Sequence, residues 1–226
     1  MTSRHRAIAA EDKAERHHAL LDAAHALFLA HPDRMASVAE VAAAAGVAKG
    51  TVYLYFPSKE EMLLALHERQ LQHFFGALMR SLEGKARVDF DAVWTVTRDK
   101  LVRAPGYLAL SSRCFGFMDR DVPTEAAVAF KVRVAAALAT AGAGLERHFP
   151  GLRRGEGVTL LQHSYGLIVG LWQLLHPIER FASAMERAEL ALFRRDYERE
   201  IERALRALWA GFPAGPGDRA AKARPR

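Results

Sequence analysis

The 226-residue sequence predicts an all-α protein, and three observations support that prediction. Apolar residues recur at three- and four-residue steps through nearly the whole chain. Runs of β-branched residues that alternate with polar ones are absent. Glycine and proline interrupt the helical pattern at Pro32, Gly46, Pro57, Gly84, Pro105, Pro123, Gly151, Pro177 and Gly211. The stretches between these interruptions correspond to about nine helices.

The N-terminal part of the chain is expected to contain four helices. The first covers residues 12–30 and buries one stripe, made of Leu20, Ala24, Leu27 and Phe28. Ser37 begins the second, because its hydroxyl can accept from the first turn while Glu40 reaches back to complete a capping box. Gly46 ends that helix in a left-handed conformation. The third covers 48–55, and Ser58 caps a fourth that continues to Leu82.

Five further helices are expected after Gly84, near residues 89–103, 105–113, 123–147, 156–175 and 179–210. The run Phe115-Gly116-Phe117-Met118 interrupts the helical pattern, and we expect it to form a mobile wall of a pocket. Residues 212–226 have no apolar face and are expected to be a disordered tail.

The segment from Ser37 to Phe56 has the spacing of a helix-turn-helix, with two short helices separated by a turn that contains Gly46. Its small core is expected to consist of Val38, Val41, Ala42, Val47 and Val52. The second helix then presents Lys49, Gly50, Thr51, Tyr53 and Tyr55 outward, while Phe56 joins the core. The alternative is that the tyrosines are core residues too, but one short helix cannot bury all of these side chains on one stripe.

Each outward residue suits DNA chemically. Gly50 lets backbone N–H groups approach a phosphate or a base closely. Lys49 brings a mobile charge for a guanine edge or a phosphate, and Thr51 offers a hydroxyl and a methyl group. The hydroxyls of Tyr53 and Tyr55 can bond phosphates on either side.

The run AEVAAAAGVAKGTVYLYFPSKEEML resembles the signature of the tetracycline-repressor (TetR) family of bacterial regulators, and LLDAAHALF fits that family's first helix. The resemblance implies a DNA-binding head over residues 14–74, with its helix-turn-helix at 37–56, and a helical ligand-binding and dimerisation body over 75–211. It implies that Lys49, Gly50, Thr51, Tyr53 and Tyr55 contact DNA from the recognition helix, and that Ser37 and Lys59 contact phosphates. Two positions depart from the family pattern: Ala48 replaces a capping Ser or Thr, and His31-Pro32-Asp33 replaces a glycine turn.

The last two helices of the body are predicted to form a homodimer interface. Apolar residues recur there at helical steps, and Gly166 and Gly170 permit close approach of another helix. The expected interface residues are Tyr165, Ile168, Val169, Trp172, Phe181, Met185, Leu192 and Leu205. The alternative is that both helices belong to the core of one monomer.

The middle helices mix bulky apolar residues with a few polar ones, as a pocket for a largely apolar effector would. The candidate lining residues are Trp94, Arg98, Tyr107, Ser111, Cys114, Phe115, Phe117, Met118, Phe130 and His163. The alternative for each of them is ordinary core packing. Cys114 could sense oxidants, but a single cysteine on an apolar helix is usually inert.

Composition argues against several other classes of protein. The net charge is +6, but residues 1–56 carry six basic and six acidic residues, so charge does not mark the head. Glu15-x-x-His18 has the spacing of a di-metal motif, but no second copy exists, so no metal or cofactor is expected. The sequence contains no run of 18 or more uncharged apolar residues, so no membrane span is expected. One cysteine and no secretory signal favour the cytoplasm.

Together with these observations, the resemblance to the TetR family implies a ligand-released homodimeric repressor that binds a palindromic double-stranded DNA operator, and no enzymatic activity. One alternative is an activator of the same fold. Another is a helical small-molecule-binding protein or enzyme that carries a non-functional head.

Overall fold

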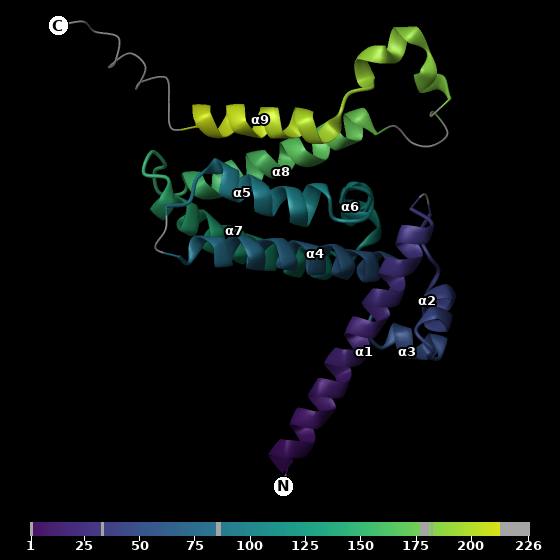
Figure 1. Ribbon diagram of the computed structural model, residues 1–226. Coiled ribbons are helices and arrows are strands. Elements are labelled where there is room, and N and C mark those ends of the chain that lie inside the picture. Colours follow the sequence, from purple (N-terminus) through teal and green to yellow (C-terminus); the bar gives the residue numbers. More distant parts are fainter. Residues whose placement is uncertain (1, 33, 85–86, 177–180, 182, 213–226) are drawn as a thin grey trace, which may run out of the picture. The chain divides into compact units, whose positions relative to one another are not determined.

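The computed structural model describes residues 2–32, 34–84, 87–176, 181 and 183–212, with side chains from Glu11 onward. All regular elements in these ranges are helical, which confirms the all-α prediction (Figure 1). They are α1 (Thr2–Ala30), α2 (Val38–Ala44), α3 (Lys49–Tyr53), α4 (Lys59–Leu82), α5 (Phe90–Thr97), the π-helical turn η1 (Arg98–Val102), α6 (Tyr107–Asp121), α7 (Thr124–His148), α8 (Glu156–Leu175), the 3₁₀ turns η3 (Ala184–Glu186) and η4 (Ala188–Phe193), and α9 (Tyr197–Gly211). The predicted tail at 212–226 lies, from residue 213, outside the described residues.

The chain divides into two compact units. Unit 1 joins Met1–Gln70 to Pro105–Phe130, and unit 2 joins Leu71–Ala104 to Lys131–Arg226. Unit 1 therefore contains the predicted head up to Gln70 together with α6, although α6 follows that head by more than thirty residues in the chain; residues 71–74 of the predicted head belong to unit 2.

Within unit 1, α6 begins against the C-terminal end of α1. Gly106 has a φ of +70°, and a Cβ at this position would lie 2.7 Å from a methyl carbon of Leu29, so glycine suits both the backbone and the space. The Arg113 guanidinium donates to the carbonyl of Pro32. The expected α1 stripe is confirmed for Leu20, Ala24 and Phe28, which are buried, while Leu27 is half-buried. These interactions hold α1 against α6.

Within unit 2, α7 and α8 cross at two glycines. A Cβ on Gly157 would lie 2.3 Å from the carbonyl oxygen of Gly142, so no side chain fits at the crossing. The Glu146 carboxylate accepts from the backbone N–H groups of Gly155 and Gly157, at 2.8 and 3.1 Å. An acidic group at this point satisfies first-turn donors of α8 and complements its dipole.

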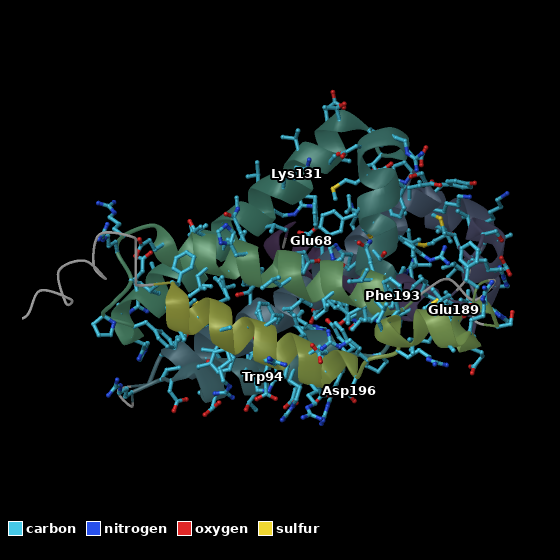
Figure 2. All side chains as sticks on the ribbon, turned by 90° about the horizontal axis from the view of Figure 1, so that it is seen from above. Glu68, Trp94, Lys131, Glu189, Phe193 and Asp196 are labelled. Carbon is cyan, nitrogen blue, oxygen red and sulfur yellow. The ribbon has the colours of Figure 1, made fainter. Side chains whose placement is uncertain are left out.

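The last helix, α9, packs on α8 and is tied to α5. The indole Nε1–H of Trp209 donates to Ser164 Oγ at 3.0 Å, and the Tyr197 hydroxyl donates to the carbonyl of Ile168 at 2.8 Å. Arg206 pairs with Asp91 of α5 at 2.8 Å. Figure 2 shows Trp94 beside α9, and it shows Glu189 and Phe193 on the 3₁₀ turn η4, which comes before Asp196 at the N-cap of α9.

Three predicted element boundaries were wrong. The expected helix at 179–210 is instead two 3₁₀ turns followed by α9, because Arg187 is extended and Asp196 caps a new helix by accepting from the Arg199 N–H at 2.7 Å. The expected break at 115–118 is absent, since α6 continues through it to Asp121. The first helix begins near residue 2 rather than 12, in an alanine-rich stretch that favours helix.

One described helix, α7, is long and apolar enough to cross a membrane by length and composition, with an 18-residue window of mean hydropathy 1.4. A single such helix is weak evidence, because helices of soluble proteins pass the same test. Lys131 and Arg133 near its middle would be costly in hydrocarbon.

Candidate nucleic-acid interface

The helix-turn-helix in unit 1 forms as its local sequence requires. The Glu40 N–H donates to Ser37 Oγ at 3.2 Å, and the Ser37 N–H donates to the Glu40 carboxylate at 2.8 Å, which completes the predicted capping box. Hydrogen bonds from Arg34 and Ser37 hold the pKa of Glu40 at about 2, so this carboxylate stays charged. Gly46 adopts a φ of +67°, as expected for the turn.

The core of this motif is small and well sealed. Val38, Val41, Ala42 and Val52 are buried as predicted, and Val47 is half-buried. Because this core fixes the angle between α2 and α3, the exposed side of α3 has a defined position within unit 1.

The exposed side of α3 carries the predicted residues Lys49, Gly50 and Tyr53. Ala48 precedes the helix without a side-chain cap, as expected from its sequence. Lys49 is exposed, and a Cβ on Gly50 would meet nothing within 4 Å. The Tyr53 ring is 46% exposed and lies 5.9 Å from Lys49 Nζ, so the ammonium group and the ring form one surface.

Two residues directly after α3 differ from the sequence-based expectation. Leu54 is 81% exposed, and this apolar side chain was not predicted to be a surface residue. Tyr55 is half-buried, with its ring 6.3 Å from that of His17 on α1. Phe56 is buried as predicted, 4.9 Å from the same imidazole, and desolvation followed by repulsion from His18 and Arg69 lowers the pKa of His17.

A hollow of about 380 Å³ lies between the beginnings of α2, α3 and α4. Its walls are Ser37, Val38, Ala39, Lys49, Tyr53, Pro57, Ser58, Lys59 and Glu60. The hollow therefore gathers four of the seven predicted DNA contacts, namely Ser37, Lys49, Tyr53 and Lys59; Gly50, Thr51 and Tyr55 lie outside its walls.

The charge of this hollow favours an anion. It combines two ammonium groups with the N-terminal end of the 24-residue α4, whose dipole is positive there. Ser58 caps α4 by accepting from the Glu61 N–H at 3.1 Å. Lys59 Nζ lies 3.7 Å from the Glu60 carboxylate, so Glu60 offsets part of that charge.

The candidate pocket residues are divided between the two units. In unit 1, Tyr107, Ser111, Cys114, Phe117, Met118 and Phe130 are buried, whereas Phe115 is exposed. In unit 2, Trp94 is buried, Arg98 is half-buried and pairs with Asp99 at 2.9 Å, and His163 is exposed. Burial alone does not distinguish a ligand pocket from core packing, so the pocket remains a prediction.

The buried aromatic residues of unit 1 surround a histidine that sequence reasoning missed. His67 on α4 is 3% exposed and stacks on Tyr107, with ring centroids 5.7 Å apart, and lies 5.8 Å from Phe130. Burial lowers the pKa of His67 to about 4, so the imidazole is neutral at pH 7. Its position on the apolar stripe of α4, four residues from Leu63 and Leu71, is the signal that could have identified it.

Cys114 lies in the same buried region. Burial raises the pKa of its thiol to about 12, and Sγ–H faces the carbonyl of Leu63 at 3.9 Å. The thiol is therefore not ionised near pH 7, which favours the inert packing role over oxidant sensing.

The predicted interface residues fall into two groups. Ile168, Val169 and Leu205 are buried within this one chain and serve the core of unit 2. Tyr165, Trp172 and Met185 are half-buried, and Phe181 and Leu192 are exposed. A Cβ added at Gly166 or at Gly170 would contact no described atom within 4 Å, so this side of α8 is open among the described residues of the single chain.

Metal binding has no support among the described residues, where no group of three or more His, Cys, Asp or Glu side chains could hold an ion.

Comparison with known proteins identifies the family. Residues 20–66 match the model for bacterial regulatory proteins of the tetR family, and residues 68–216 match the tetracyclin repressor-like C-terminal domain. The fatty acid metabolism regulator protein of Bacillus subtilis (strain 168) is 33% identical over 67 residues, which is 30% of this chain and 34% of that protein. The chain thus matches about a third of the length of that curated relative.

Two solved structures share the fold. The fatty acid degradation regulator FadR from Bacillus halodurans has a TM-score of 0.56 at 19% identity, covering 85% of this chain and 97% of that one. SmeT, the repressor of the Stenotrophomonas maltophilia multidrug efflux pump SmeDEF, has a TM-score of 0.51 at 23% identity, covering 86% and 89%. With both family models matched in their expected order along the chain, this protein belongs to the tetR family of bacterial regulatory proteins.

Proposed function

We propose that this regulator is a homodimeric repressor that binds a palindromic operator and is released by a largely apolar small molecule. One observation carries the DNA-binding part of the proposal. The capped α2–α3 pair exposes Lys49, Gly50 and Tyr53 beside a hollow that also holds Ser37 and Lys59. Lysine, tyrosine and serine at one concave surface are the groups that bind phosphate oxygens, while the open surface at Gly50 admits a base edge.

The first experiment identifies the operator. Genomic fragments are selected with the purified protein, and binding to the enriched palindrome is then measured by fluorescence anisotropy. We expect Lys49→Ala to weaken operator binding by ~10-fold or more, because a good lysine contact contributes about 1–3 kcal/mol. Tyr53→Phe removes only the hydroxyl, so a smaller decrease of ~5-fold is expected.

Lys100→Ala is the matched control, because it removes an exposed lysine from the π-helical turn of unit 2. It should leave operator affinity unchanged. Unchanged affinity in both Lys49→Ala and Tyr53→Phe would remove these two residues from the interface.

The homodimer is proposed to form through the open side of α8. Gly166 and Gly170 leave space for a second helix, and Leu167 and Leu174 beside them are exposed. A two-fold axis at this face would present two recognition helices to the two halves of a palindrome. Phe181 and Leu192 would extend this face; Ile168, Val169 and Leu205 would support it from within the chain.

The effector is proposed to act from the body of the protein. Ligand release requires that the small molecule bind the conformation with wrongly spaced recognition helices more tightly, by about 1–3 kcal/mol of coupling. The names of the relatives include two regulators of fatty acid metabolism or degradation, which suits an apolar effector. A cytoplasmic location and the absence of enzymatic activity complete the proposal, as both accord with a regulatory family.

A further inference from the structure

The described side chains in the first half of α1 lie on the surface of unit 1. Exposed residues run without interruption from Glu11 to Arg16, and the first half-buried side chain is that of His17. The core stripe begins only at Leu20. Figure 1 shows α1 continuing well past α3 toward the N-terminus.

The packing along α1 fixes the direction of this projection. Near its C-terminal end, Phe28 and Leu29 pack against Gly106. Farther toward the N-terminus, His17 packs against Phe56, just beyond the recognition helix. The helix then continues through residues 2–16, and at 1.5 Å per residue it extends about 22 Å beyond that point.

A helix of this length needs a surface to support it. Isolated helices shorter than about 12–15 residues are marginal in water, because their stability in proteins comes mostly from packing. The projecting part of α1 extends from the point where the DNA-facing helix ends. When the protein is bound to its operator, the surface that the projecting part of α1 can reach is the DNA duplex next to the half-site.

The charge of the projecting part fits a nucleic acid at its tip. Residues 1–10 contain Arg4 and Arg6 and no acidic residue. Lys13 and Arg16 follow and are exposed, although the three acidic residues Glu11, Asp12 and Glu15 outnumber them nearer the head. The net positive charge is therefore at the far end, where a flanking phosphate backbone would lie.

We infer that residues Thr2–Arg16 form a DNA-binding arm that contacts the phosphate backbone flanking each operator half-site. This inference rests on the proposed operator binding by α3. The arm adds affinity without reading sequence, because phosphate contacts position a protein and base contacts specify the site. N-terminal arms that supplement a major-groove helix in this way are an established device in other DNA-binding folds.

The test uses the full chain, a chain lacking Thr2–Ala10, and the double variant R4Q/R6Q. Each is measured by anisotropy on two duplexes, one trimmed to the selected palindrome and one with a helical turn of flanking DNA, about 10 base pairs, on each side. We expect the deletion and R4Q/R6Q to weaken binding to the flanked duplex by ~10-fold. The salt slope should fall by about 0.9 for each phosphate that the variant no longer neutralises. Affinity for the trimmed duplex should change far less.

The variant R153Q/R154Q is the charge-matched control, because it removes two exposed arginines from the connection between α7 and α8. It should bind both duplexes as the full chain does, and circular dichroism should show that every variant keeps its helical fold. Equal affinity of the full and shortened chains for the flanked duplex would overturn the inferred DNA-binding arm. The inference would also fail if the deletion changed the oligomeric state and nothing else. If instead the full chain showed no preference for any palindrome, the proposed operator binding itself would fail.

Discussion

The buried imidazole of His67 predicts a specific loss of stability in acid. His67 is 3% exposed, between the rings of Tyr107 and Phe130, and burial lowers its pKa from 6.5 to about 4. In the unfolded chain the imidazole binds a proton near pH 6.5, whereas in the folded protein it does not until about pH 4. Stability is therefore present in full above pH 6.5 and is lost as the pH falls toward 4.

The size of this destabilisation follows from the two pKa values. Between pH 6.5 and 4, each unit of pH costs about 1.4 kcal/mol of unfolding free energy. Between pH 7 and pH 5 the decrease is about 2 kcal/mol, and by pH 4 it reaches about 3 kcal/mol. In urea, a decrease of about 2 kcal/mol corresponds to a midpoint shift of roughly 1 M.

The assay is urea unfolding at pH 7 and pH 5, followed by far-UV circular dichroism. All three tryptophans, Trp94, Trp172 and Trp209, lie in unit 2, so their fluorescence reports that unit separately from His67. The variant His67→Phe keeps a ring at this position and removes the titrating group, and we expect its midpoint to shift by about 1 M less than that of the wild type.

His31→Phe removes an exposed imidazole and is the control, which should keep the wild-type pH dependence. His17, whose pKa is also lowered, contributes equally to wild type and to His67→Phe, so it cancels in their difference. A His67→Phe variant that loses as much stability in acid as the wild type would refute the reasoning.

Three further predictions concern the body. Gly157→Ala should lower the free energy of unfolding in urea by about 2–4 kcal/mol, because its Cβ would collide with the Gly142 carbonyl. Gly116→Ala is the control: this glycine is also in a helix, but its Cβ would meet open space, so the substitution should raise the free energy of unfolding by up to about 1 kcal/mol. Leu174→Glu, at a position 56% exposed on the proposed dimer face, should yield monomers in analytical ultracentrifugation, and Val128→Glu, at a comparably exposed position on α7, should not. Cys114, whose pKa is raised to about 12, should react with a thiol reagent in the native protein far more slowly than in urea; rapid native labelling would restore the redox hypothesis.

The DNA-binding head could be predicted in detail because the interactions that define it are local. Ser37 and Glu40 cap α2 across three residues, and Gly46 ends the turn six residues later. Phe56 is buried against His17 of α1, and the sequence could not show this contact, because it joins residues thirty-nine positions apart. The same contact explains why Tyr55 is only half-exposed.

The body could be predicted only as a set of helices, because its packing depends on contacts between distant segments and its proposed function depends on a second chain. On α4, the apolar stripe through Leu63 and Leu71 could identify His67 as buried, but it could not show that its partners are Tyr107 and Phe130 from distant helices. On α8, Ile168 and Val169 belong to the same apolar pattern as Leu167 and Leu174, yet the first two face the chain's own core and the last two face outward. An apolar stripe indicates that a helix face is buried from water, but it does not indicate which partner buries it. Mutating the two faces of α8 separately would therefore distinguish folding from dimerisation: changes at Ile168 should lower the stability of a single chain, and changes at Leu174 should lower only the affinity between chains.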